Sequence, residues 1–309
     1  MKRTLKIALL AFLATVGIIA LLALFIQLKP LPNYADEVAI PELTITPTPE
    51  LLALGEKIVS SDCAGCHGSE SHKLEGMLNP ELDVKPLGTI YNSNITQHET
   101  DGIGSYSDGE LYRLLRTGVK KDGALAFPMM PRLALMAEED VHAIIAFLKS
   151  DHPMVAPSPV GLPDSEPSFL ARMLFTVEWA PTPYQEPVPQ GVDEGDAVAW
   201  GKHLITTRYY CYICHSANPS QANILSPELT PNYLNGGYRF LFASHEIDVP
   251  SITMNDESMV RHWSEEEFVG AVKWGQRPGG KPYVEPMHPY TLVDTSEIQA
   301  MWAYLKTLN

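Results

Sequence analysis

The chain has 309 residues, enough for about two domains of the usual ~100–200 residues. Its residues are 45% hydrophobic and 19% charged, which excludes a wholly disordered protein because such a chain can bury a core. The 22 Lys and Arg residues against 37 Asp and Glu give a net charge of -15, which argues against nucleic-acid binding and favours cationic partners.

The first expected element is a transmembrane helix. Residues 7–28 carry no charge, and 22 helical residues span about 33 Å, enough for the ~30 Å hydrocarbon core of a bilayer. Three basic residues precede this run, so the positive-inside tendency leaves the N-terminus cytoplasmic and the rest of the chain facing the periplasm. The alternative is a cleaved signal peptide, but the run exceeds the ~7–15 residues of a signal core and no A-x-A site follows it. We predict a single-pass anchor at residues 1–28.

A proline-rich spacer is predicted at residues 29–49. Five prolines lie in this segment, at positions 30, 32, 41, 47 and 49. Proline at this density favours an extended chain. The spacer is therefore expected to hold the folded part of the protein off the membrane.

All four cysteines lie in two C-x-x-C-H motifs, which consist of Cys63, Cys66 and His67, and of Cys211, Cys214 and His215. This motif attaches c-type haem: its thiols form thioethers to the haem vinyl groups, and the following histidine is the proximal iron ligand. A zinc site built from two C-x-x-C pairs usually separates them by ~15–20 residues, whereas the first cysteines here are 148 apart. A thioredoxin-like pair or a disulfide requires no histidine directly afterwards. Two covalently bound haem c groups are therefore predicted.

The two halves of the chain repeat at an offset of 157 residues. The matching positions include Asn94-Ile95-Thr96 with Ser251-Ile252-Thr253, Gly118 with Gly275, and Ala146-Phe147-Leu148-Lys149 with Ala303-Tyr304-Leu305-Lys306. An unbroken register from 94 to 149 implies a duplicated unit. Because the haem motifs are offset by 148 instead, nine extra residues lie between His215 and Ser251 in the second copy.

Each unit is expected to be all-α, with three helices around a haem. The expected first helices are Pro49–Ser60 and Gly195–Thr206, the middle helices follow Ser107 and Ser264, and the last helices carry Val141–Leu148 and Ile298–Leu305. Glu110 and Glu267 complete capping boxes with the two serines. The middle helices should end near Gly118 and Gly275, and an i, i+3, i+4, i+7 apolar face marks each last helix.

The sixth iron ligand is expected to be a methionine between the middle and last helices. Met130 and Met287 stand at equivalent repeat positions, each beside a proline that stiffens the loop. Met129 is the alternative in the first unit, but its repeat counterpart is Pro286, which cannot be a ligand. His288 is the main competitor of Met287.

A second proline-rich segment separates the two units. Nine of the 26 prolines lie between Asp151 and Glu194, so residues 151–193 are predicted to be a linker between cytochrome c domains at 50–150 and 194–309. Apolar residues in Ser168–Trp179 predict a short helix within it. We expect this helix to strap the two haem domains together.

Several segments resemble the cytochrome c subunits of membrane-bound bacterial alcohol, gluconate and aldehyde dehydrogenases. They are Gly88-Thr89-Ile90-Tyr91, Asn94-Ile95-Thr96, Gly102-Ile103-Gly104-Ser105-Tyr106-Ser107 and Phe127-Pro128-Met129-Met130-Pro131. The likeness covers most of residues 50–150 and is weaker in the second half. In that family the methionine of the Pro-x-Met-Pro element is the axial ligand, which supports Met130.

The resemblance also implies a role in electron transfer. Members of the family typically carry three haems and collect electrons from a dehydrogenase for a quinone or an oxidase. This chain departs by having two haem motifs and an N-terminal anchor. Its second half has Val284-Glu285-Pro286-Met287-His288-Pro289-Tyr290 in place of the usual methionine element, and a long insertion, taken as Tyr233–Val249, for which the family suggests no role.

The sequence therefore predicts a dihaem cytochrome c that relays single electrons at the outer face of the cytoplasmic membrane. Its redox partner would be a dehydrogenase, a cytochrome or an oxidase. His/Met ligation leaves neither iron an open position for substrate, which predicts a carrier rather than an enzyme. Two alternatives are a dihaem peroxidase, which needs one haem able to open such a position, and a fixed cytochrome subunit of a terminal oxidase.

Overall fold

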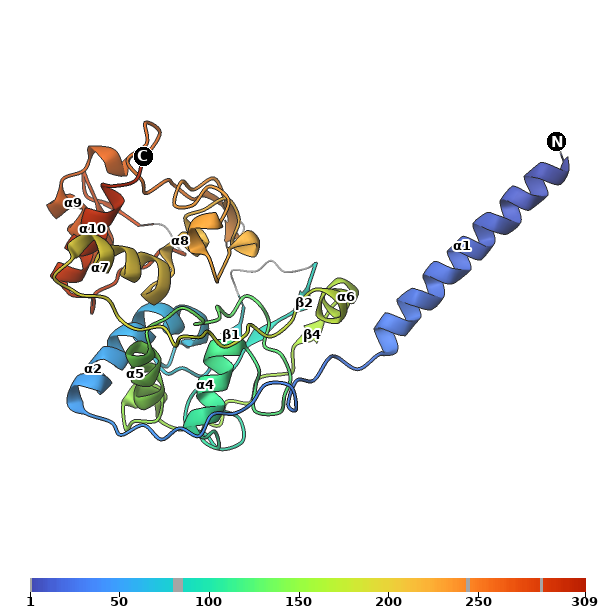
Figure 1. Ribbon diagram of the computed structural model, residues 1–309, viewed down its shortest axis with the longest axis horizontal. Helices are drawn as coiled ribbons and strands as arrows, with labels where there is room; N and C mark the ends of the chain where they lie inside the picture. The colour runs from blue at the N-terminus through green and yellow to red at the C-terminus, as the bar shows by residue number, and fades with distance from the viewer. Residues whose placement is uncertain (1, 80–85, 243–244, 284–285) are drawn as a thin grey trace.

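A computed structural model of the chain describes residues 2–79, 86–242, 245–283 and 286–309. Helix α1 (Lys2–Leu28) projects from a helical body (Figure 1). The part from Arg3 to Leu28 is long and apolar enough to cross a membrane, and its apolar window is not buried by the rest of the chain. The predicted spanning segment is therefore one uninterrupted helix.

The segment that follows α1 is extended, as its prolines predict, but it lies along the body instead of standing free of it. The amide of Tyr34 donates to the carbonyl of Gly123 over 2.8 Å, and the amide of Ile45 donates to Oδ2 of Asp108 over 2.8 Å. These contacts leave only a few residues between the end of α1 and the body. The expectation of a spacer that holds the folded part away from the membrane is corrected accordingly.

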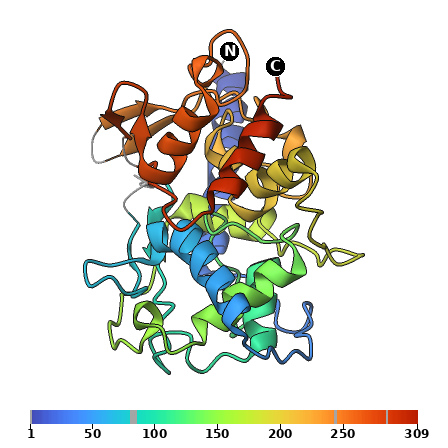
Figure 2. The ribbon, with the colours of Figure 1, turned by 90° about the vertical axis from the view of Figure 1, so that its left-hand side faces the viewer.

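The first unit contains α2 (Pro49–Ile58), α3 (Ala64–His67), α4 (Asp108–Thr117) and α5 (Glu138–Leu148), and the second contains α7 (Ala197–His203), α8 (Cys211–Cys214), α9 (Glu265–Trp274) and α10 (Thr295–Leu305). Short 3₁₀ turns occupy Pro153–Val155, Pro219–Gln221, Pro227–Leu229 and Val260–His262. The two units lie one above the other in Figure 2, and buried side chains of both units form one continuous hydrophobic cluster.

The first and last helices of each unit cross at a glycine. A Cβ on Gly55 of α2 would collide with the carbonyl oxygen of Ala143 in α5, and a Cβ on Gly201 of α7 would collide with that of Ala300 in α10. Ala143 and Ala300 are separated by the repeat offset of 157. The same close crossing is therefore built twice, because only glycine lets the two helix backbones approach so closely.

Replacing Gly201 by alanine is expected to destabilise the protein by about 1–3 kcal/mol, because the carbonyl that a new Cβ would strike cannot move without shifting α10. Gly191→Ala in the exposed linker is the matched control, since a Cβ there meets no atom within 4 Å. Denaturant unfolding followed by circular dichroism measures both variants. Equal stabilities would contradict the crossing.

The middle helices begin and end as the sequence predicts. Ser107 Oγ accepts from the amide of Glu110 over 3.1 Å while the Glu110 carboxylate accepts from the amide of Ser107 over 2.8 Å. Ser264 and Glu267 form the same capping box. Both helices end at a glycine in the left-handed region, with φ of 83° at position 118 and 68° at position 275. The capping boxes and the helix ends are thus confirmed.

The expected first helices end differently. Each passes into a π-helical turn, η1 (Val59–Cys63) or η3 (Leu204–Arg208). The expected ends at Ser60 and Thr206 fall inside these turns. The wider turn continues the helix to the segment that carries each C-x-x-C-H motif.

The all-α expectation needs one correction, because the described residues contain four two-stranded antiparallel ladders. They pair β1 (Met77–Leu78) with β3 (Tyr91–Asn92), β2 (Gly88–Thr89) with β4 (Glu166–Pro167), β5 (Arg239–Phe242) with β6 (His245–Asp248), and β7 (Gln276–Arg277) with β8 (Lys281–Pro282). Strands of two to four residues are too short to show a clear alternation of polar and apolar residues. The body remains rich in helix.

The linker contains the predicted helix, α6 (Phe169–Val177), but α6 does not strap the units together. It contacts α1, and Phe175 packs with Val119, Leu125 and Phe127 of the first unit in a small separate core. The linker then runs along the first unit, where the amide of Thr182 donates to the carbonyl of Thr117. Helical periodicity predicts an apolar face, but not the neighbour that covers it.

Candidate functional site

The first C-x-x-C-H motif presents a histidine with one ring nitrogen already used. His67 Nδ1 donates to the carbonyl of Ser93 over 2.7 Å, so Nε2 is the nitrogen that keeps a lone pair. Burial lowers the pKa of His67, against a smaller opposing effect of this hydrogen bond. A neutral, oriented imidazole with Nε2 available is what a metal ligand requires.

The second motif repeats this arrangement. His215 Nδ1 donates to the carbonyl of Pro250 over 2.9 Å, and burial lowers the pKa of His215 as well. Ser93 and Pro250 are 157 residues apart, the same offset that relates the two halves of the sequence. Both histidines are therefore oriented by equivalent backbone carbonyls of a duplicated unit.

The loops between the middle and last helices are also held alike. In the first unit the amides of Ala126 and Leu133 donate to the carbonyls of Gly118 and Leu115, each over 2.8 Å. In the second unit the corresponding bonds run from Tyr283 to Gly275 and from Tyr290 to Val272, each over 2.9 Å. All four pairs keep the offset of 157. Met130 and Met287 lie at the same place between these fixed points, although residues 284–285 lie outside the described part of the chain.

His288, the competitor of Met287, has another partner. Its Nε2 donates to the carbonyl of Ser61 in the first unit over 2.7 Å, and its ring stacks on that of Tyr290. This bond engages the nitrogen that would otherwise point away from the backbone. It therefore favours Met287 as the ligand.

The structure relocates the insertion in the second unit. Gly76 and Gly236 occupy equivalent positions, because each has a positive φ and each donates its amide to the carbonyl of the haem-motif histidine, His67 or His215, over 2.8 Å. The segment from this histidine to the glycine is twelve residues longer in the second unit, whereas the following segment to Ser93 or Pro250 is three residues shorter. The extra residues thus lie before Tyr233, and the hairpin β5–β6 takes the place of the β1–β3 ladder instead of being the insertion.

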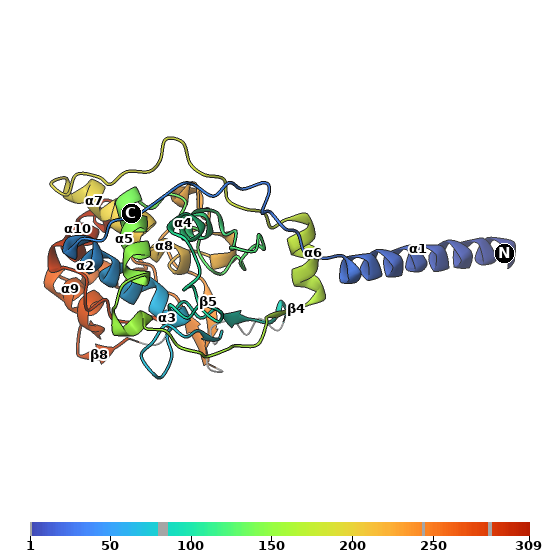
Figure 3. The same cartoon turned by 90° about the horizontal axis from the view of Figure 1, so that it is seen from below.

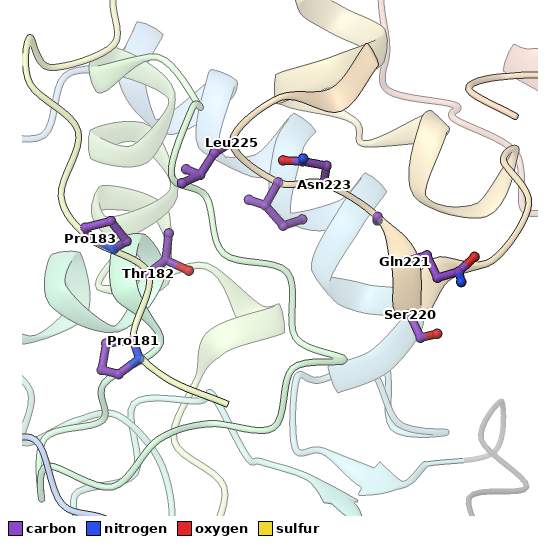
Figure 4. A pocket seen from close by; sticks show the side chains of 9 residues that line it. Pro181, Thr182, Pro183, Ser220, Gln221, Asn223 and Leu225 are labelled. Carbon is purple, nitrogen blue, oxygen red and sulfur yellow. The ribbon is translucent and has the colours of Figure 1, made fainter. Parts of the chain in front are cut away.

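A shallow surface pocket lies between this insertion and the linker (Figure 4). It is lined by Pro181–Pro183 and Ser220–Leu225, a set without charged side chains and without any of the predicted haem ligands. The pocket therefore offers no group for acid–base or redox chemistry. It shows the insertion lying beside the linker.

Each haem motif contacts the other unit near its methionine loop. Besides the bond between His288 and Ser61, the hydroxyl of Tyr210, which directly precedes Cys211, donates to the carbonyl of Arg132 over 3.4 Å. Arg132 lies two residues after Met130. The two predicted haem sites thus adjoin the same interface between the units.

A buried ion cluster spans this interface. Arg208 of the second unit donates to both carboxylate oxygens of Asp140 in the first, over 3.0 and 2.7 Å, and to Glu297 over 2.8 Å. Lys57 of the first unit reaches Glu297 over 2.9 Å and Asp294 over 2.5 Å. The side chains of Asp140, Arg208 and Glu297 are at most 8% exposed. Single charged residues at these positions carry no sequence signal, so the cluster could not be predicted.

The donor sets fit covalently bound haem better than a zinc ion. The described part of the chain contains no group of three or more His, Cys, Asp and Glu side chains that could hold a metal. Each motif instead offers two cysteines and one neutral histidine on a short helical turn, with a methionine on a loop of the same unit. This is the ligand set of a His/Met c-type haem.

Comparisons with known proteins agree with this geometry. Residues 52–151 match the family model for cytochrome c. The chain is 29% identical over 239 residues to the cytochrome c subunit of a quinone alcohol dehydrogenase of Gluconobacter oxydans, covering 73% of this chain and 47% of that protein.

Two further relatives are cytochrome subunits of sugar or sugar-acid dehydrogenases. The fructose dehydrogenase cytochrome subunit of Gluconobacter japonicus is 29% identical over 265 residues, covering 81% of this chain and 51% of that one. The gluconate 2-dehydrogenase cytochrome c subunit of Pantoea cypripedii is 27% identical over 275 residues, covering 84% and 60%. The chain thus spans about half the length of these relatives. It contains a cytochrome c domain and is homologous to dehydrogenase cytochrome c subunits, which confirms the predicted resemblance.

Proposed function

We propose that this chain is a membrane-anchored dihaem cytochrome c that relays single electrons from a dehydrogenase to an acceptor in or at the membrane. The observation that carries the proposal is the matched environment of the two motifs, in which His67 and His215 donate to carbonyls 157 residues apart. The names of the relatives support the dehydrogenase as the electron source.

The residues divide into two equivalent sets. Cys63 and Cys66 would bind the first haem with His67 and Met130 as axial ligands, and Cys211 and Cys214 would bind the second with His215 and Met287. The units at residues 50–150 and 194–309 would each be a cytochrome c domain, joined by the linker at 151–193. Bound haem supplies one-electron exchange.

The protein contributes orientation and exclusion. Hydrogen bonds from Nδ1 hold both imidazole rings and raise the basicity of Nε2. Methionine as the second axial ligand raises the potential and fills the position at which peroxide or substrate would otherwise bind. Equivalent ligation in both units therefore favours an electron carrier over a dihaem peroxidase.

The membrane span places the relay. Residues 1–28 would anchor the chain in the cytoplasmic membrane with the haem domains on the periplasmic side, because the basic residues precede the span. The net charge of -15 favours a redox partner with a basic docking surface.

Substrate-driven haem reduction tests the proposal. Membranes that contain the chain and its dehydrogenase should show reduced c-type haem after addition of the dehydrogenase substrate, and the Cys63→Ser/Cys66→Ser variant should show about half that absorbance, because one attachment site is lost. Rapid peroxide turnover by the half-reduced chain would contradict the relay and support a peroxidase.

A further inference from the structure

Helix α6 is apolar on two opposite sides. Ala171 and Phe175 are buried against the first unit. The outward side carries Phe169, Leu170 and Val177, whose exposures are 43%, 39% and 70%. A surface helix that faces water presents polar residues on its outer side, so this side lacks the composition that water would favour.

The position of α6 relative to α1 indicates what covers that side. Helix α6 lies across the end of α1 at which the apolar span stops (Figures 1 and 3). The only charged side chain of α6, Arg172, donates through Nη2 to the carbonyl of Lys29 over 2.7 Å. Lys29 directly follows the last residue of the span, Leu28. A helix bound at this point lies at the level where the hydrocarbon core meets the headgroups.

Neighbouring side chains suit the same environment. Trp179, just beyond α6, packs edge-to-face on Phe175 with ring centroids 4.8 Å apart, and Lys29 lies over the ring of Phe25 at the end of α1. Tryptophan and basic residues are enriched where a membrane protein crosses the bilayer surface. An apolar helix face with such flanking residues is typical of a helix that lies in the interface.

We propose that α6 is an interfacial helix, and that Phe169, Leu170 and Val177 enter the boundary between the headgroups and acyl chains of the bilayer that α1 spans. The occupant of the exposed face is lipid, because the face is continuous with the end of the span. This inference rests on the proposed anchor. It gives the first unit a second membrane contact, so that this unit is held against the bilayer instead of turning freely on a single helix.

The test places a nitroxide label at Val177→Cys in the full-length chain, reconstituted with haem in phosphatidylcholine vesicles. Leu229→Cys is the matched control, because Leu229 is also apolar and 73% exposed but belongs to the second unit. Oxygen concentrates in lipid and a nickel chelate in water. The ratio of their collision rates with the label should be several-fold higher at position 177 than at position 229.

Each outcome decides a different claim. A nickel-accessible label at position 177, equal to that at position 229, would overturn the interfacial helix while leaving the anchor intact. A label shielded from both oxygen and nickel would show a protein partner on α6 and overturn the lipid assignment. Chain that fails to enter vesicles would overturn the anchor and this inference together. Label uptake by the parent chain would instead refute haem attachment, since all four cysteines would otherwise be used.

Discussion

Replacing Met130 by alanine is expected to remove about half of the weak far-red absorption that marks methionine-ligated ferric haem, and Met287→Ala is expected to remove the other half. Both methionines lie between equivalent backbone hydrogen bonds, from Ala126 to Gly118 and from Tyr283 to Gly275 at their near ends. Since methionine ligation raises the potential of a c-type haem, each variant should also lower the potential of one haem and leave the other unchanged. Redox titration followed by optical spectroscopy measures both effects.

Met129→Ala is the control for the first unit, because Met129 is adjacent in sequence and has Pro286 as its repeat counterpart. It should leave the far-red band and both potentials unchanged. If Met129→Ala removes the band and Met130→Ala does not, the ligand assignment is wrong. In the second unit, His288→Ala should likewise retain the band, because His288 Nε2 is bonded to the carbonyl of Ser61.

Arg208→Met is expected to destabilise the protein by about 3–5 kcal/mol, the usual effect of removing one partner from a buried ion pair. The substitution would leave Asp140 and Glu297 buried without the guanidinium that joins them across the interface. Arg239→Met is the matched control. Arg239 also pairs with two carboxylates, Glu246 and Asp248, but all three side chains are more than half exposed, so about 0–1 kcal/mol is expected. Denaturant unfolding of the haem-loaded proteins compares them, and equal losses would contradict the role of Arg208.

The effect of Arg208→Met should depend on pH in a defined direction. Burial alone would raise the pKa of Asp140, but hydrogen bonds from His203 and Arg208 and the nearby charges outweigh it and lower that pKa. A carboxyl whose pKa is lowered on folding contributes stability above its unfolded pKa and loses it as the pH falls through the folded value. The stability difference between the parent and Arg208→Met should therefore be largest near neutral pH and shrink in acid.

Features encoded within a short stretch of sequence could be predicted. The C-x-x-C-H motifs, the capping boxes at Ser107 and Ser264, and the glycine ends of the middle helices each depend on a few neighbouring residues. The offset of 157 also predicted more than it was used for, because the carbonyls of Ser93 and Pro250 obey it. Repeats preserve backbone hydrogen bonds even where the side chains differ, so such pairs could have been sought from the register alone.

Features that depend on distant neighbours could not be predicted. No local pattern indicates that Arg208 meets Asp140, or that His288 reaches Ser61. The insertion was misplaced because no residues match between His215 and Ser251, and only the backbone bond at Gly236 restores the register. The spacer and α6 were predicted correctly as extended chain and helix, but their positions against the first unit depend on packing that their own sequences do not specify.

The central claim, two covalently attached haems in equivalent units, is tested most directly by counting haem on denatured protein. After acid–acetone extraction, a haemochrome assay against polypeptide concentration should give two haems per chain. Cys63→Ser/Cys66→Ser and Cys211→Ser/Cys214→Ser should each give one, and the variant with all four substitutions none. One haem per parent chain, lost from Cys63→Ser/Cys66→Ser and unaffected by Cys211→Ser/Cys214→Ser, would contradict the account.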